Sequence, residues 1–268
     1  MVTADDFGLS VAVNEAVEQA ARNGALTCAS LMISERAALD AIERARSLPG
    51  LGVGLHVVVA DARPMLPADQ IPDLVNSSGK LRDDLFAASV AIFARPSVRR
   101  QLAREIEAQF AAFAATGLTL DHVNVHKHLH MHPTTAGLIF QIGRRYGMRA
   151  LRIPREPTAR GIPARLMRWW AGTLGARARR AGLSVNDHLL GLAATGQMTE
   201  TQTLALLDGL APGVTELYFH PATSRPPELV GPMPDYRHTD ELAALLSPAV
   251  KHKLAAMGVP RIRFGDLA

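Results

Sequence analysis

The 268-residue sequence predicts an α/β protein, a distorted (β/α) TIM-like barrel with about seven parallel strands. Three observations favour this fold. Strand and helix patterns alternate from the first residue, which is typical of a parallel sheet. Several predicted strands end on polar side chains, as barrel strands do where they build an active site. The length suits one such barrel, so we expect residues 1–268 to form a single domain.

The predicted strands cover residues 2–6, 26–33, 51–57, 120–126, 149–153, 215–220 and 260–264. We expect the first helix to begin after Ser10, a residue type that caps helix N-termini, and to end at Gly24. Further helices are predicted at residues 36–46, 97–115 and 198–210. Residues 61–81 and 226–237 are expected to form loops at the rim of the site.

Alternation along the strands predicts which side chains enter the barrel. In residues 51–57 the apolar side chains occupy the odd positions, and His56 shares the even face with two glycines. The same alternation places several polar side chains on inward faces: Asn124, His126, Arg152, Glu216, Tyr218 and His220. With His56, these residues come from four strands, and several lie at the carboxyl ends, where a barrel enzyme has its active site.

Composition limits the classes of function. Arginines spread along the chain give most of the net charge of +4, and no basic-aromatic repeat is present, so we expect no nucleic-acid partner. The single cysteine, Cys28, has apolar neighbours and is predicted to be a buried structural thiol. Without an apolar leader or a membrane-spanning run, the expected location is the cytoplasm. The first strand looks cut short, which suggests a native start upstream.

The most distinctive pattern is a row of four histidines at alternate positions: His126, His128, His130 and His132. In an extended strand they would share one face. Because imidazole is the commonest metal ligand, the row indicates a metal site, although a histidine-rich loop or surface strand is the alternative.

The pair Asp5-Asp6 at the end of the first strand strengthens the metal hypothesis. One carboxylate and two neutral imidazoles leave room on a divalent ion for water and substrate, which is a hydrolytic arrangement. One aspartate could bind the metal while its neighbour accepts a proton. Taken alone, an aspartate pair is more often a solvated turn, and a lone strand histidine such as His56 is more often a core residue.

Together these segments resemble the YdjC-like carbohydrate deacetylases, the family of chitooligosaccharide deacetylase. The motifs that carry the resemblance run in order along nearly the whole chain: residues 3–10, 54–56, 126–130 and 218–221. Within the family the chain is most similar to the hopanoid-biosynthesis-associated branch, through residues 120–124, 152–157 and 185–187.

The resemblance implies an enzyme that removes acetyl groups from N-acetylated sugars with one divalent metal ion. Zn²⁺ is the first expectation and Mg²⁺ the alternative; manganese and cobalt also suit such ligands. By position, Asp6, His56 and His126 match the metal ligands. Asp5 matches the general base, and His220 the general acid that protonates the leaving amine. The resemblance also suggests a homodimer.

Three further residues are candidates for substrate binding. The family commonly shows three consecutive histidines where Lys127 interrupts the row here. His128 and His130 are therefore open between substrate contact, support of the ligands and an alternative ligand. Arg152 is expected either to bind a sugar hydroxyl or the acetyl carbonyl, or to form a structural ion pair.

Residues 165–180 carry both tryptophans and five arginines, with no acidic residue. A basic helix of this kind can lie against the inner face of a membrane, which would bring the site to a glycolipid substrate. The other interpretation is a helix packed on the barrel with a solvated basic face.

The leading hypothesis is therefore a metal-dependent deacetylase acting on the N-acetylglucosaminyl head group of a hopanoid glycolipid. The alternatives are a chitooligosaccharide deacetylase of sugar catabolism, another metal-dependent barrel hydrolase, and a non-catalytic metal- or sugar-binding barrel. Amidohydrolases usually carry His-x-His where this chain has Asp5-Asp6. A binding protein would not need both Asp5 and His220.

Overall fold

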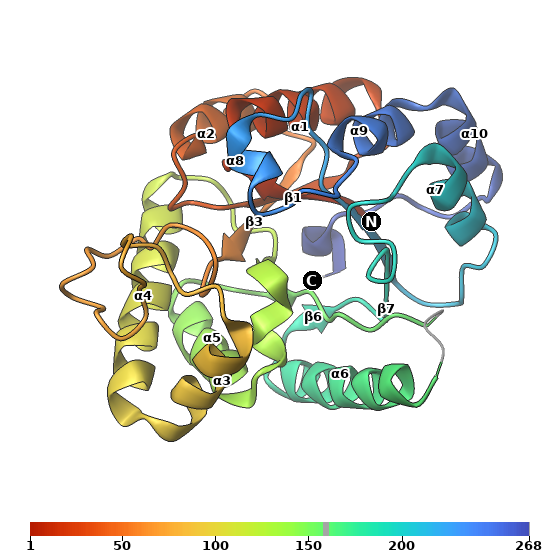
Figure 1. Cartoon of the computed structure of the whole chain (residues 1–268). Coiled ribbons are helices and arrows are strands. Elements are labelled where there is room, and N and C mark those ends of the chain that lie inside the picture. Colours follow the sequence, from red (N-terminus) through yellow and green to blue (C-terminus); the bar gives the residue numbers. More distant parts are fainter. Residues whose placement is uncertain (158–160, 268) are drawn as a thin grey trace.

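Eight parallel strands form one curled sheet in the computed structural model, which describes residues 1–157 and 161–267 (Figure 1). The strands are β1 Val2–Phe7, β2 Cys28–Leu31, β3 Gly52–Val57, β4 Val123–Val125, β5 Ala150–Leu151, β6 Ser184–Val185, β7 His188–Leu190 and β8 Thr215–Phe219. Their order in the sheet is β6-β5-β4-β3-β2-β1-β8-β7, and each pair of neighbours is parallel. The predicted fold class is thereby confirmed.

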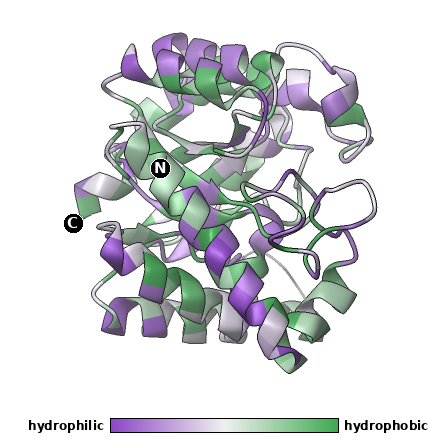
Figure 2. Ribbon diagram, turned by 90° about the vertical axis from the view of Figure 1, so that its left-hand side faces the viewer, coloured by the Kyte–Doolittle hydropathy of each residue, from purple (hydrophilic) through white to green (hydrophobic). Residues whose placement is uncertain are grey.

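Helices surround the sheet. They are α1 Val11–Asn23, α2 Ala38–Arg46, α3 Leu85–Ala94, α4 Pro96–Ala115, α5 Pro133–Arg145, α6 Ile162–Arg180, α7 Glu200–Leu207, α8 Pro227–Val230, α9 His238–Leu246 and α10 Pro248–Ala256, with 3₁₀ segments η1 His126–Met131 and η2 Phe264–Leu267. Figure 2 shows green strands at the centre and helices that carry both purple and green residues around them. Among the described residues, no helix is long and apolar enough to cross a membrane.

The sheet curls into a barrel with an open seam. Its two edge strands, β6 and β7, are separated only by Asn186 and Asp187, so their ends cannot lie more than about 10 Å apart. The Asn186 side chain bridges this seam, because its amide exchanges hydrogen bonds with the backbone of Ile153 and donates to the carbonyl of His188. The alternation pattern missed both strands, since two or three residues are too few to show a period.

The strand predicted at residues 260–264 is wrong. Residues 260–263 have no regular structure, and η2 follows them. Phe264 is fully buried and stacks on the ring of His122 at 4.7 Å, while the Gly265 N–H donates to Asp121. The segment therefore closes the amino end of the barrel as a plug instead of joining the sheet.

Inward-facing glycines make room for the buried side chains of Asp121 and His122, which form a polar layer at the amino end of the barrel. A Cβ on Gly54 would lie 2.5 Å from the His122 ring, and one on Gly52 would lie 2.7 Å from the Asp121 carboxyl group. His122 in turn contacts Asp121 and the Ser30 hydroxyl, at 2.9 and 3.0 Å. The inward direction predicted for the even positions of residues 51–57 is confirmed.

The same layer contains Cys28, which is buried as predicted. Burial raises the pKa of its thiol to about 12, so the group stays protonated at neutral pH. Its sulfur lies 3.7 Å from an oxygen of Asp121.

The first helix shows how local sequence sets these elements. Ser10 accepts a hydrogen bond from the Val13 N–H and caps α1, as predicted. At the other end, a Cβ on Gly24 would lie 2.6 Å from the carbonyl oxygen of Leu245, so glycine permits the close approach of α9. The helix predicted at residues 97–115 is α4, but α3 directly before it was not predicted.

Replacing Gly54 by alanine is expected to lower the free energy of unfolding by about 1–3 kcal/mol, because the new methyl group overlaps the His122 ring. Urea denaturation followed by circular dichroism measures the change. Gly50→Ala is the matched control, since that position is exposed and a Cβ there meets nothing within 4 Å. Equal midpoints for the two variants would contradict the tight packing at Gly54.

Candidate functional site

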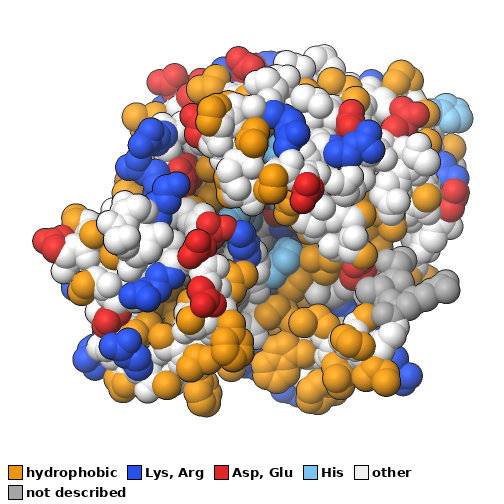
Figure 3. Space-filling model, in the orientation of Figure 1, with side chains coloured by type: hydrophobic (Ala, Val, Ile, Leu, Met, Phe, Trp, Pro, Cys, Tyr) orange, Lys and Arg blue, Asp and Glu red, His pale blue; other side chains and the backbone are white. Residues whose placement is uncertain are grey.

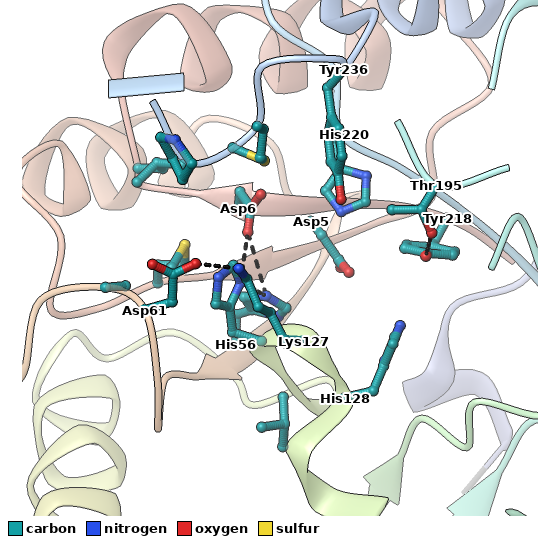
Figure 4. Close-up of a pocket in the computed structure, with 17 residues that line it drawn as sticks. Asp5, Asp6, His56, Asp61, Lys127, His128, Thr195, Tyr218, His220 and Tyr236 are labelled. Atoms are coloured by element: carbon teal, nitrogen blue, oxygen red, sulfur yellow. Dashed lines mark hydrogen bonds and ion pairs between the residues drawn. The ribbon is translucent and has the colours of Figure 1, made fainter. Parts of the chain in front are cut away.

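A cavity of about 130 Å³ opens at the carboxyl ends of the strands (Figure 4). Six of the eight predicted site residues line it: Asp5, Asp6, His56, His126, His128 and His220. Ligand pockets usually measure about 300–1,000 Å³, so this one holds only part of a ligand. The remainder of a bound molecule would lie across the rim.

A bulge in β1 brings both aspartates into this cavity. Neighbouring residues of a regular strand point to opposite faces of the sheet. Here the register of β1 against β2 shifts between Ala4 and Phe7, and Asp6 adopts a positive φ of 62°. Such a bulge re-aims side chains, so Asp5 and Asp6 both reach the cavity.

Asp6 is the centre of a candidate metal site. One oxygen of its carboxylate lies 3.4 Å from His56 Nε2 and 3.4 Å from His126 Nδ1, and the two nitrogens are 3.3 Å apart. Neither Asp6 oxygen has a hydrogen-bond partner among the described residues, although both are buried. A buried carboxylate needs a positive charge or hydrogen-bond donors beside it. One carboxylate oxygen and two imidazole nitrogens are ligands that suit a divalent cation. The residues present therefore fit a metal.

Electrostatics in the pocket agree with this fit. Burial favours the neutral form of Asp6, yet its contacts with His126 and His56 hold its pKa well below the usual range. Burial likewise lowers the pKa of His56, but the neighbouring charges of Asp5 and Asp6 outweigh it and the pKa is raised. The pocket therefore strongly favours positive charge beside Asp6.

Asn124 fixes the orientation of two site residues. Its amide nitrogen donates to Asp5 at 3.0 Å and to the Ser30 hydroxyl at 2.8 Å. The amide oxygen is therefore the group 2.6 Å from His56 Nδ1, and that ring nitrogen must donate to it. In the neutral imidazole, His56 Nε2 therefore carries the lone pair and faces Asp6, as a metal-ligating histidine requires.

Arg152 is buried beside the site and does not line the cavity. Its guanidinium bonds to Glu216 at 2.6 and 3.0 Å and also pairs with Asp5. Burial opposes ionisation of Asp5, but the charges of Arg152 and His56 hold the pKa of Asp5 below its usual range. Of the two roles expected for Arg152, the structure shows the ion pair.

The histidine row does not form the extended strand that the sequence suggested. β4 ends at Val125, and Lys127 and His128 adopt left-handed φ values of 54° and 55°. The chain therefore coils, and three consecutive residues, His126 to His128, face the cavity. His130 instead contacts the carbonyl oxygen of Arg152 at 3.0 Å, outside the cavity lining, and burial lowers its pKa to about 3.

His220 follows β8 and enters the cavity from the side opposite His56 in Figure 4. Its backbone is fixed by two partners, since Glu241 accepts from its N–H and His238 donates to its carbonyl. Its ring Nδ1 is buried without a hydrogen-bond partner in the described structure. Burial lowers the pKa of His220, and the charges of Asp6 and Asp5 oppose that effect.

Several cavity residues were missed as site candidates. Tyr218 could have been identified, because it lies on the predicted inward face of its strand. Asn124, which orients His56 from outside the cavity lining, lies on such a face too. Two other cavity residues could not be identified from the sequence, because they come from loops without periodicity. They are Asp61, which pairs with Lys127 at the rim, and Tyr236. Both loops had been expected to reach the rim, and each contributes to the cavity lining.

Comparison with known proteins gives consistent matches. Residues 1–256 match the family described as YdjC-like protein. A carbohydrate deacetylase from Geobacillus stearothermophilus is 32% identical over 267 residues, which cover 99% of this chain and 96% of that protein. A chitooligosaccharide deacetylase from Enterobacter sp. strain 638 is 33% identical over 160 residues, 59% of this chain and 60% of the other.

A crystal structure described as that of a putative cellobiose-phosphate cleavage protein from Enterococcus faecalis V583 is also similar. It has a TM-score of 0.78 and 23% identity, and the alignment covers 100% of this chain and 98% of that chain. This likeness shows a shared fold.

Replacing Arg152 by methionine is expected to lower the free energy of unfolding by about 3–5 kcal/mol, because it leaves Asp5 and Glu216 buried without their cation. Chemical denaturation measures the loss. Arg36→Met, the same change at an exposed position, should alter stability by less than about 0.5 kcal/mol. Similar stabilities of the two variants would show that the buried carboxylates do not need Arg152.

Proposed function

This chain belongs to the YdjC-like protein family, and from that premise we propose that it is a metal-dependent carbohydrate N-deacetylase. The observation that carries the proposal is the buried Asp6 carboxylate. It lacks a hydrogen-bond partner in the described structure and faces two imidazole nitrogens, His56 Nε2 and His126 Nδ1. Asp5 and His220 line the same cavity and could transfer protons.

Asp6, His56 and His126 would hold one divalent ion, with Zn²⁺ the first choice and Mg²⁺ the alternative. When bound, such an ion supplies Lewis-acid chemistry, which polarises a carbonyl and makes water more acidic. The hydrogen bond from His56 to Asn124 keeps the ligating nitrogen directed at Asp6.

The chain's own groups account for the proton transfers. Asp5, which Arg152 keeps ionised, accepts a proton from the water that attacks the acetyl carbon. His220, whose ring Nδ1 has no hydrogen-bond partner in the described structure, donates a proton to the amine as the carbon–nitrogen bond breaks. The products are acetate and a free amino sugar, so one water is consumed for each amide bond broken.

His128 is the cavity residue placed best to bind the sugar. Burial and the nearby His130 hold its pKa well below the usual range, so it is neutral at pH 7. Its Nδ1 has no hydrogen-bond partner in the described residues, which leaves it free to bond a hydroxyl group. We assign Arg152 and His130 to support of the site, because neither lines the cavity.

The substrate that we propose is an N-acetylglucosaminyl group carried by a hopanoid lipid. The small cavity would take the acetamido end of the sugar, and the lipid would lie outside it. The resemblance to the hopanoid-associated branch supports this choice. A free chitooligosaccharide is the alternative, since the Enterobacter relative carries that name.

Asp5→Asn is expected to lower the rate of acetate release by at least about 100-fold, because the general base is lost. The variant should still bind Zn²⁺, as measured by isothermal titration calorimetry. Asp6→Asn is the matched change one residue away and should lose both activity and Zn²⁺ binding. Turnover that survives in Asp5→Asn would rule out Asp5 as the base.

Acetate release from two substrates tests the choice of acceptor. The Zn²⁺-loaded enzyme is offered N,N′-diacetylchitobiose and an N-acetylglucosaminyl lipid at equal concentration, and acetate is assayed enzymatically. We expect a higher kcat/KM with the lipid. Release from the disaccharide alone would favour the chitooligosaccharide alternative, and release from neither would overturn the deacetylase proposal.

A further inference from the structure

Two helices beside the cavity expose an unusual amount of apolar surface. We use the term apolar platform for six side chains of α3 and α6: Phe86, Val90, Phe93, Ile162, Leu166 and Trp169. Each is between 51% and 81% exposed. Figure 3 shows apolar side chains gathered over these two helices, below the central hollow of the molecule. Exposed apolar surface of this extent, concentrated in one place, marks an interaction site.

Neither helix uses these side chains to pack on the barrel. In α3 only Ile92 is buried, although every residue of that helix except Ser89 is apolar. In α6 the buried residues lie between Ala171 and Ala178, so the half that carries Ile162, Leu166 and Trp169 contributes none to the core. The fold therefore gives no internal reason for the platform.

The platform borders the cavity through η1. Trp170 of α6 donates its indole N–H to the carbonyl of Met131, 2.8 Å away, at the end of η1. On the α3 side, Phe93 contacts the ring of His132 with 6.4 Å between centroids. η1 also contains Lys127 and His128, which line the cavity. A surface that covers the platform would therefore lie next to the mouth of the site.

The charge of α6 is positive. The helix carries Arg165, Arg168, Arg177, Arg179 and Arg180 and no acidic residue, and the first two lie in the half with the platform. α3 carries no charged residue, and Asp83 and Asp84 directly precede it. Arg165 is exposed among the apolar side chains of α6. Arginines beside exposed tryptophan and phenylalanine complement a lipid surface with anionic head groups, where aromatic rings lie at the interface.

We propose that the apolar platform docks on the surface of an anionic lipid bilayer and so presents the cavity to head groups of that surface. The choice of a bilayer rests on the lipid-linked substrate proposed above as well as on the charge of α6. Docking requires no membrane-spanning helix, because the aromatic side chains would enter only the interfacial layer.

Cosedimentation of the full chain with vesicles tests the proposal. Vesicles of phosphatidylcholine with 30% phosphatidylglycerol, a composition chosen for the assay, are compared with phosphatidylcholine alone. We expect the protein to pellet with the anionic vesicles. The double variant Phe86→Ser/Trp169→Ser should bind them at least about tenfold more weakly, because two aromatic anchors are lost. Leu39→Ser is the matched control, since Leu39 is 77% exposed on α2 and should not affect binding.

Three results would overturn the proposal: equal recovery in the supernatant with and without anionic lipid, binding that the double variant retains, or equal loss of binding in Leu39→Ser. A platform covered by a second copy of the chain would appear as a dimer that the double variant dissociates, without vesicle binding. Sedimentation is measured without substrate, and hydrolysis of N,N′-diacetylchitobiose is assayed separately. Failure of docking and failure of the deacetylase proposal are therefore distinguishable.

Discussion

The geometry of the site depends on the buried guanidinium group of Arg152. Arg152 lies at the centre of the barrel between Asp5 and Glu216, and none of these three groups could be buried alone at acceptable cost. Once the guanidinium fixes Asp5, the amide of Asn124 has one determined orientation, and His56 then has one determined tautomer. Five strands or strand ends are thus tied together by polar contacts inside the barrel. These polar contacts therefore determine where the side chains of the neighbouring cavity lie.

Unusual backbone conformations also determine which side chains enter the cavity. Asp6, Lys127 and His128 all have positive φ, a conformation that costs a residue with a side chain of the order of 1–3 kcal/mol. In each place the effect is the same, because adjacent residues that a regular strand would send to opposite faces enter one cavity. This geometry allows a short segment to supply two or three functional groups. The strain lies where the chemistry is proposed, and the regular strands hold it in place.

The alternation of side chains along regular strands predicted which residues of those strands point inward. The inward faces of β3 and β8, with His56 and His220 at their ends, follow from alternation alone. Departures from regular backbone could not be read in this way, because neither the bulge at Asp6 nor the coil at Lys127 has a sequence signature distinct from an ordinary strand end. Tyr236 comes from a loop, and its position depends on long-range packing. The family resemblance, in contrast, identified aspartates and histidines that the fold does bring together.

The position of β1 has a kinetic consequence. The first strand of the chain lies inside the sheet, paired with β2 on one side and with β8 on the other, and its amino group bonds to the carbonyl of Thr215. During synthesis, one edge of β1 therefore stays open until the ribosome has made β8, Thr215–Phe219. Contacts so distant in sequence slow folding, and an unpaired strand edge invites association with other chains. The aspartates of β1 and His220 cannot meet before that late closure, so the nascent protein has no site.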